Sequence, residues 1–322
     1  MGALRVAVVG VGYLGRFHAQ KYAQAPGCTL VGVADARADV AGAVATELGT
    51  RAVADHRTLL GQVDAVSVVT PTPAHFAVAS DFLRAGAHVL VEKPICETVE
   101  QARELVALAR SAGRVLQVGH LERFNPAIVA AEPLLGRPRF IECARLAPFR
   151  ERGTDVNVVL DLMIHDLDIV QSIVGADVAT IDAVGTPVFS PEIDIANARI
   201  RFANGCVANA TASRVSLKTE RKLRVFLDDA YLSIDLHQKI LTVIRKGAAP
   251  GEPGALPVSI DERSFEQGDA LRTEIEAFLA SCRGERPVVV SGEDGLRALQ
   301  TAVAITQAVR ASAGADHLQT KL

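Results

Sequence analysis

A glycine-rich turn near the N-terminus constrains the fold of this 322-residue chain more than any other feature. Residues 4–9 (LRVAVV) form a continuous apolar run, which is typical of a parallel strand covered on both faces. Gly10, Gly12 and Gly15 follow at once in the pattern G-x-G-x-x-G, where a strand must turn into a helix. This order predicts a dinucleotide-binding turn whose helix N-terminus attracts phosphate groups.

An acidic residue after the next apolar run specifies the dinucleotide. Asp35 ends that run about twenty residues after Gly15, where an acid accepts the ribose hydroxyls of NAD. The same carboxylate would repel the extra phosphate of NADP, although Arg37 is an arginine of the kind that accommodates it. We therefore expect NAD as the cofactor.

Apolar runs alternate with helical patterns as far as residue 120. Six such runs predict a doubly wound parallel sheet, and a helix is expected to begin at the capping-box pair Thr98 and Gln101. Ligands of this architecture bind at the carboxyl ends of the strands. The residues expected at the cofactor site are Gly10, Gly12, Tyr13, Leu14, Gly15, Asp35, Arg37, Thr70, Pro71, Glu92, Lys93 and Gln117.

After residue 120 the pattern changes, so we expect two domains, 1–120 and 121–322. Six runs between residues 178 and 245 alternate as strands do and predict an open-faced antiparallel sheet. The apolar positions of that sheet predict that its open face pairs with a second subunit. The other elements expected in this half are helices over 126–135, 156–174, 269–282 and 292–312 and a strand over 139–146.

Composition narrows the possible partners. A net charge of -3, 4% aromatic residues and the absence of tryptophan argue against binding to nucleic acid or to an anionic membrane. No apolar run approaches the roughly twenty residues that span a bilayer. The five cysteines are scattered singly, and the chain begins directly with a core strand that leaves no room for a signal peptide. These features predict a cytoplasmic protein with reduced thiols.

Lys93 is the first candidate for catalysis. The segment Glu92-Lys93-Pro94 places it at the carboxyl end of a predicted strand. An ammonium group there can polarise a substrate oxygen or take part in proton transfer. Taken alone, a lysine at a strand end is more often a solvated surface residue, so its role depends on its partners.

A polar stripe on the predicted helix 156–174 provides those partners. Asn157, Asp161, His165 and Asp168 are spaced by four, four and three residues and would lie on one face of an otherwise apolar helix. Burying them is costly unless each has a partner or a function. The stripe fits a packing network or a catalytic histidine, and a metal site ranks last because no other histidine or cysteine clusters with it.

Basic residues gather in two places that could bind a diphosphate. The first group is Arg145, Arg150 and Arg152, and the second is Arg214, Lys218, Arg221, Lys222 and Arg224. Clusters of charge are usually solvated faces, and we favour that interpretation for each group. Arg123, which follows the last predicted strand of the first domain, is the arginine that we favour for substrate binding.

These motifs together resemble the Gfo/Idh/MocA oxidoreductases over essentially the whole chain. The resemblance is carried by the glycine turn, Thr70-Pro71 with His75, Glu92-Lys93-Pro94 and Asp161-x-x-x-His165. It implies an α/β Rossmann domain that binds NAD, followed by an α+β domain whose open-faced antiparallel sheet forms a homodimer or homotetramer. It also implies that His75 belongs to the cofactor site, that Lys93 and His165 are catalytic and that Asp161 positions them.

Within the family, residues 119–126 (GHLERFNP) and the LDLMIHDLDIV helix are most similar to members that oxidise the 3-hydroxyl of UDP-N-acetylglucosamine. This similarity implies a nucleotide-sugar substrate, a place in amino-sugar synthesis for lipid A or surface polysaccharide, and an aminotransferase as a pathway partner. The residues that it implies for substrate binding are His120, Arg123, Asn125, Arg150, Asn157, Asp161 and His165.

Two alternatives remain open at this point. The same chemistry could act on a free sugar, an inositol or a sugar acid, which would leave the basic clusters without a ligand. The same architecture could also serve as an NAD-sensing regulator without turnover. A sensor has no need for a proton acceptor beside the nicotinamide, so the presence of both Lys93 and His165 argues against it.

Overall fold

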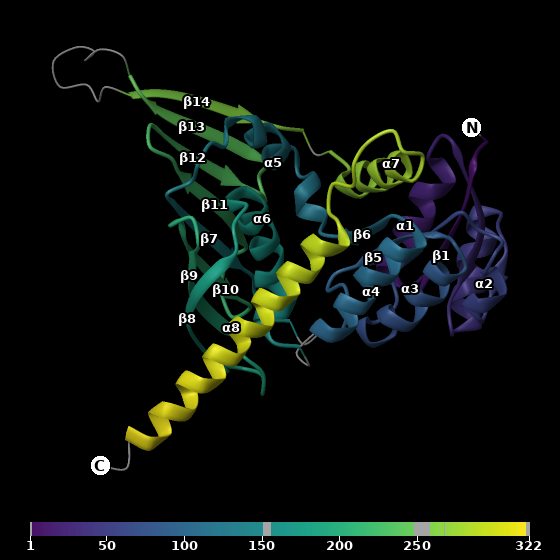
Figure 1. Ribbon diagram of the computed structural model, residues 1–322, viewed down its shortest axis with the longest axis horizontal. Coiled ribbons are helices and arrows are strands. Elements are labelled where there is room, and N and C mark those ends of the chain that lie inside the picture. Colours follow the sequence, from purple (N-terminus) through teal and green to yellow (C-terminus); the bar gives the residue numbers. More distant parts are fainter. Residues whose placement is uncertain (1, 151–155, 248–257, 267, 320–322) are drawn as a thin grey trace. The chain divides into compact units, whose positions relative to one another are not determined.

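The computed structural model describes residues 2–150, 156–247, 258–266 and 268–319. The chain divides into two compact units, and Figure 1 labels their helices and strands. Unit 1 is Met1–Phe124 with Asp269–Leu299, and unit 2 is Asn125–Gly268 with Gln300–Leu322. The chain thus returns to unit 1 late in the sequence, which a single boundary at residue 120 does not capture.

Unit 1 contains the predicted six-stranded parallel sheet. Its order is β3-β2-β1-β4-β5-β6, so the direction of winding reverses between β1 and β4. Ligands of a doubly wound sheet bind at this reversal, at the carboxyl ends of the strands. The strands are β1 (Leu4–Val9), β2 (Cys28–Ala34), β3 (Ala52–Val53), β4 (Ala65–Val68), β5 (His88–Glu92) and β6 (Leu116–Gly119).

Helices cover both faces of this sheet. One group pairs α1 with α2 and α7, and the other pairs α3 with α4. The α4 helix begins with the predicted capping box, in which Thr98 Oγ1 accepts the N–H of Gln101, and it ends at Gly113. The helices of unit 1 are α1 (Tyr13–Gln24), α2 (Ala38–Leu48), α3 (His75–Arg84), α4 (Val99–Ala112) and α7 (Ala270–Cys282).

Unit 2 is built on an eight-stranded sheet of order β14-β13-β12-β11-β7-β10-β9-β8. It is mixed rather than purely antiparallel, because β7 and β10 pair in parallel. The strands are β7 (Phe140–Leu146), β8 (Val178–Thr186), β9 (Ile195–Phe202), β10 (Val207–Ser213), β11 (Glu220–Phe226), β12 (Ala230–Asp235), β13 (Ile240–Lys246) and β14 (Val258–Ser264). The sequence did not predict β14, whose residues are all exposed and mostly polar.

The helices of unit 2 differ in detail from those predicted. The helix expected over 156–174 begins with a π-helical turn, Val159–Met163, and continues as α6 (Ile164–Val174), which packs on β7 and β10. The helix expected over 126–135 is α5 (Pro126–Ala131), followed by a short 3-10 turn that contains Pro133. The last helix, α8 (Gly292–Gln319), begins in unit 1 and continues in unit 2, where the Oγ1 of Thr301 accepts a hydrogen bond from Gln171. No helix in the described part of the chain has the length and apolar character needed to cross a membrane.

Candidate functional site

The turn after β1 requires glycine at two positions. Gly10 has a φ of 85°, and a Cβ placed on it would lie 2.6 Å from the carbonyl oxygen of Val69. A Cβ on Gly15 would lie 1.8 Å from the oxygen of Gly10. Only glycine at position 15 therefore allows α1 to lie this close to the turn. A Cβ on Gly12 would meet only the guanidinium of Arg37, at 3.7 Å, which leaves open space over the start of α1.

The N-terminus of α1 is suited to a pyrophosphate. Gly12 occupies its N-cap without a side-chain cap, and its first turn carries no acidic residue. The first N–H groups of a helix lack partners within the helix and carry a partial positive charge, so they bind anions. Tyr13 and Leu14, which begin α1, are 73% and 39% exposed. The turn therefore fits the dinucleotide that the sequence predicts.

Asp35 lies at the carboxyl end of β2 and faces the glycine turn. Its Oδ2 accepts the N–H of Val11 at 3.0 Å, and its Oδ1 accepts the N–H of Arg37 at 3.0 Å. The Nε of Arg37 lies 3.6 Å from Oδ1. An ionised carboxylate has about four acceptor positions, so Asp35 retains capacity for the hydroxyls of a ribose.

His75 connects the ends of β4 and β5. Its Nε2 lies 2.8 Å from the oxygen of Thr70 and its Nδ1 lies 2.9 Å from the oxygen of Pro94. Burial lowers the pKa of His75, and the two carbonyl contacts oppose that effect. With 1% of its surface exposed, His75 fixes the positions of Thr70 and Pro94. We infer that it acts on a cofactor through them.

Lys93 follows β5 at a turn that the Glu92 side chain stabilises. Glu92 Oε2 accepts the N–H of Lys93 at 3.3 Å, and Glu92 Oε1 lies 3.1 Å from His18 Nε2. The carboxylate fills the space beside Gly119, where a Cβ would come 2.7 Å from Oε1. Lys93 itself is partly buried, at the sheet edge where ligands bind.

The polar stripe of unit 2 spans a change of helix type. Asn157 is buried, and its Oδ1 accepts the N–H groups of Val159 and Leu160, so it caps the helix. Asp161 lies in the π-helical turn, and His165, partly buried, is the second residue of α6. Single π-helical turns occur frequently at functional sites because they redirect side chains. Asp168 is 2% exposed and lies in the helix interior.

Several residues expected to bind substrate also have structural contacts. Asn125 caps α5 through the N–H of Ala127 and donates its Nδ2 to the oxygen of Leu236. Arg123 Nη2 donates to the oxygen of Val289 at 3.3 Å. His120 is 1% exposed. Arg150 is exposed, at the end of the described segment.

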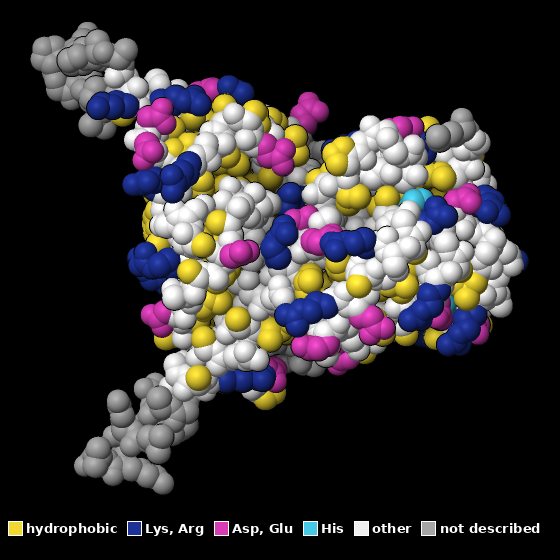
Figure 2. Space-filling model, in the orientation of Figure 1, with side chains coloured by type: hydrophobic (Ala, Val, Ile, Leu, Met, Phe, Trp, Pro, Cys, Tyr) yellow, Lys and Arg dark blue, Asp and Glu magenta, His cyan; other side chains and the backbone are white. Residues whose placement is uncertain are grey.

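Acidic partners neutralise much of the two predicted basic clusters. Arg145 forms a bidentate, buried pair with Asp166, and Arg214 pairs with buried Asp194 at 2.7 Å. Both arginines are buried, so the solvated-face interpretation that we favoured is wrong for these two, and their pairs with acids indicate a structural role. Two exposed members also form ion pairs, Lys218 with Glu220 and Arg224 with Glu142. Arg152 lies outside the described residues, and the face shown in Figure 2 has charges of both signs interspersed.

A buried polar cluster in unit 1 was not predicted. His18 Nδ1 lies 3.3 Å from Ser67 Oγ, which lies 2.8 Å from the hydroxyl of Tyr22. One ring nitrogen of His18 and one carboxylate oxygen from each of Glu92 and Glu274 all lie within 4.8 Å of one another. The periodicity of α7 could have indicated that Glu274 is buried. Glu274 occupies a core-facing position on the same stripe as the buried residues Leu271, Ile275 and Phe278.

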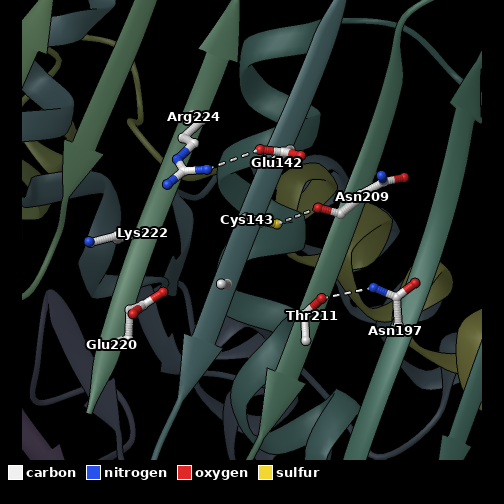
Figure 3. A pocket seen from close by; sticks show the side chains of 9 residues that line it. Glu142, Cys143, Asn197, Asn209, Thr211, Glu220, Lys222 and Arg224 are labelled. Atoms are coloured by element: carbon white, nitrogen blue, oxygen red, sulfur yellow. Dashed lines mark hydrogen bonds and ion pairs between the residues drawn. The ribbon is translucent and has the colours of Figure 1, made fainter. Parts of the chain in front are cut away.

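The open face of the unit 2 sheet, opposite α6, carries a shallow hollow of about 300 Å³ (Figure 3). Side chains from β7, β9, β10 and β11 line it, including those of Glu142, Asn197, Asn209, Thr211, Lys222 and Arg224. Beside this polar row the strand register aligns an apolar row, Phe140, Phe226, Tyr231, Ile244 and Ile260. The rings of Phe226 and Tyr231 stack with centroids 4.8 Å apart.

Two family descriptions match this chain. The oxidoreductase family with an NAD-binding Rossmann fold (GFO_IDH_MocA) matches residues 4–120, and its C-terminal alpha/beta domain matches residues 143–316. The UDP-N-acetylglucosamine 3-dehydrogenase of Acidithiobacillus ferrooxidans is 43% identical over 96% of this chain and 98% of its own length. The scyllo-inositol 2-dehydrogenase (NAD(+)) of Bacillus subtilis is 26% identical over 95% of this chain and 94% of its own.

Solved structures agree with these matches. A structure of the same Acidithiobacillus ferrooxidans dehydrogenase superposes with a TM-score of 0.91 at 42% identity, and covers 97% of this chain and 99% of that one. Levoglucosan dehydrogenase, solved with NADH and levoglucosan, has a TM-score of 0.84 at 19% identity over 96% of this chain and 97% of its own. At that identity the second similarity concerns the fold alone.

Proposed function

The chain belongs to the Gfo/Idh/MocA family of oxidoreductases, and we propose that it oxidises the 3-hydroxyl of UDP-N-acetylglucosamine to a 3-keto sugar with NAD as the oxidant. The observation that carries this proposal is the 43% identity, along nearly the whole of both chains, to an enzyme of that name. The glycine turn and Asp35 support the choice of cofactor, because they combine an anion site with an acceptor for ribose hydroxyls.

In this proposal the residues that bind NAD have distinct physical roles. The N–H groups at the start of α1 bind the pyrophosphate, flanked by Tyr13 and Leu14, and Asp35 binds the adenosine ribose. Arg37 lies over Gly12 and can pack against the adenosine. Thr70 and Pro71 follow β4, Glu92 ends β5, and Gln117 is buried within β6. His75 contacts the carbonyl oxygens of Thr70 and Pro94 and so connects the segments that follow β4 and β5.

The catalytic assignments concern a proton and a developing charge. Bound NAD supplies the hydride acceptor for the sugar carbon. His165 takes the hydroxyl proton, a task suited to a side chain that titrates near neutral pH. The ammonium of Lys93 stabilises the negative charge that develops on the oxygen. Asp161, which precedes His165 in the π-helical turn, orients it.

Substrate binding in this proposal combines direct and indirect contacts. Arg150 is exposed and can approach the diphosphate, and Arg123 is a second cation for it. His120 is 1% exposed, so we assign it to positioning the segment that follows β6 rather than to contact with the sugar. Asn125 and Asn157 cap helices, so we assign them to positioning the segments that carry the site.

The runner-up substrate is a free polyol such as an inositol, which relatives at 26% identity oxidise according to their names. A panel that mixes NAD with UDP-N-acetylglucosamine, UDP-N-acetylgalactosamine, UDP-glucose and myo-inositol separates the two, with NADH absorbance as the measurement. We expect turnover of UDP-N-acetylglucosamine, with the keto group located at carbon 3 by mass spectrometry after reduction with borodeuteride. Turnover of inositol alone would contradict the proposal.

The proposal extends to partners. The 3-keto product is suited to amination, so we expect an aminotransferase to consume it in amino-sugar synthesis for lipid A or surface polysaccharide. We place the enzyme in the cytoplasm, where its five free thiols would stay reduced. The apolar row on the open sheet face supports a homodimer or homotetramer formed through that face.

A further inference from the structure

A buried acid in α7 has no function in the chemistry described above. The side chain of Glu274 is fully buried, and neither of its carboxylate oxygens has a hydrogen-bond partner among the described residues. It lies close to Glu92, the residue that accepts the N–H of Lys93, and to His18 on α1. Two carboxylates this close in an apolar interior repel each other strongly when both are ionised.

The neighbouring acceptors lack a donor. Gln117 donates its Nε2 to the backbone oxygen of Glu274 at 3.4 Å, and Gln117 Oε1 has no partner among the described residues. With Glu274 ionised, its two oxygens and Gln117 Oε1 would all be buried acceptors without a donor, each at a cost of about 1–3 kcal/mol. A proton on Glu274 removes the charge and gives the carboxyl group a donor of its own.

Hydrogen-bond direction fixes the rest of the cluster. If His18 is neutral with its proton on Nε2, it donates to Glu92 Oε1, and Nδ1 accepts from Ser67. Ser67 then accepts from the Tyr22 hydroxyl, so every donor has an acceptor. A doubly protonated His18 would donate to Ser67 Oγ as well, and one of the two hydroxyl hydrogens of Ser67 and Tyr22 would then lack an acceptor within the cluster. Glu92 is thus the one charge of the cluster.

We propose that Glu274 carries a proton at neutral pH and acts as a positioning residue, which keeps a single negative charge on Glu92 and so fixes the turn that carries Lys93. The groups facing Glu274 are His18 and Tyr22 from α1 and Glu92 from β5, and Arg123 lies in the turn Leu121–Phe124 that also packs on α7. Burial, followed by the charge of Glu92, raises the pKa of Glu274 well above its ordinary value. The catalytic part of this inference rests on the proposed function, and the protonation does not.

Thermal unfolding against pH tests the proton. A carboxyl whose pKa is raised in the folded state stabilises the fold below its unfolded pKa, and that contribution is lost as pH rises towards the folded pKa. Glu274→Gln removes this dependence, so we expect its melting temperature relative to wild type to rise steadily between about pH 5 and pH 8. Glu276→Gln is the matched control, because Glu276 is on the same helix but is exposed and paired with Arg272. A Glu274→Gln protein that becomes less stable than wild type as pH rises would overturn the proposal.

Turnover tests the positioning. Gln retains a neutral donor of the same shape, whereas Met fills the volume without one. We expect Glu274→Gln to keep kcat within about threefold of wild type and Glu274→Met to lose about tenfold or more, with the acid limb of its kcat/KM profile moved to higher pH. Equal activity of both variants at every pH would overturn the positioning role.

Two further measurements distinguish failure of the protonation proposal from failure of the proposed function. Elemental analysis of the purified wild type would overturn the proposal if it found one zinc per chain that Glu274→Gln loses, since a cation would then occupy the place of the proton. If wild type oxidises no UDP-sugar, the proposed function fails while the stability series still decides the protonation. In that event the Lys93 turn is tested by NAD affinity, which we expect Glu274→Met to lower and Glu274→Gln to retain.

Discussion

Asp35 Oδ2 accepts the N–H of Val11 at 3.0 Å, so the acid at the end of β2 is joined to the glycine turn that follows β1. Its other oxygen accepts the N–H of Arg37. Both contacts fix the carboxylate before a ribose arrives, and a preorganised acceptor binds without an ordering cost. The carboxylate that we propose to discriminate between NAD and NADP is therefore joined to the turn that we propose to bind the pyrophosphate.

Substitutions of Asp35 should distinguish the contribution of its charge to cofactor preference from the contribution of its hydrogen bonds. Asp35→Asn keeps an acceptor for Val11 but removes the charge that repels a 2′-phosphate, so we expect kcat/KM for NADP to rise and that for NAD to fall about tenfold. Asp35→Ser should reduce NAD efficiency further because the turn loses its acceptor. The measurement is the ratio of kcat/KM for the two cofactors. Equal efficiency with both in wild type, and little change in Asp35→Ser, would contradict the assignment.

His165→Ala should abolish turnover of UDP-N-acetylglucosamine and leave NAD affinity nearly intact, because the cofactor residues belong to unit 1 and His165 belongs to unit 2. Loss of a general base costs about a hundred- to ten-thousand-fold in rate. Turnover, NAD affinity and melting temperature should be measured on one preparation, with His237→Ala, an exposed histidine of unit 2, as the control. A destabilised His165→Ala that kept its specific activity would identify a packing residue.

Asp194 should control the acid stability of unit 2. Burial would raise its pKa, but the Ser190 hydroxyl and the N–H groups of residues 188–190 outweigh burial and hold the pKa well below the usual range. A depressed carboxyl pKa stabilises the fold above about pH 4 and loses that contribution as pH falls further. Asp194→Asn should therefore lower the free energy of unfolding by about 3–5 kcal/mol at pH 7, and by less at pH 3.

Urea unfolding at the two pH values measures this difference. Asp261→Asn is the control, because Asp261 forms an exposed pair with Arg263 and should change stability by less than about 1 kcal/mol. An equal deficit for Asp194→Asn at both pH values would mean that the charge of Asp194 contributes nothing to the fold.

The sequence predicted unit 1 well because each of its strands is an apolar run ended by glycine, proline or an acid. The glycine turn, Asp35 and the capping box at Thr98 are local patterns, and the structure has them where local chemistry places them. The parallel pairing of β7 with β10 could not be predicted in this way, since residues 147–206 separate the two strands and no turn fixes their register.

Two features of the site also depend on tertiary structure. The π-helical turn at Val159–Met163 adds a residue to a helix whose apolar pattern is ordinary, so spacing alone predicts an α-helix throughout. The neighbours of the Glu274 side chain include His18 and Glu92, which lie more than 180 residues earlier in the chain. The periodicity of α7 shows only that an acid faces the core, and the fold is needed to show which groups it meets.

A charged residue in the apolar row of the open sheet face of unit 2 should weaken the proposed contact with a second subunit. Phe226 and Tyr231 stack on adjacent strands of that row and are partly exposed, and contiguous apolar surface of this kind marks an interface. We expect wild type to sediment as a dimer or tetramer at micromolar concentration and Tyr231→Glu to sediment as a smaller species, because a carboxylate buried in an interface costs several kcal/mol. Leu217→Glu is the control, since Leu217 is fully exposed in the loop between β10 and β11 and lies outside the row. A monomeric wild type would remove the second subunit from the proposal, and an unchanged Tyr231→Glu assembly would move the interface to another surface.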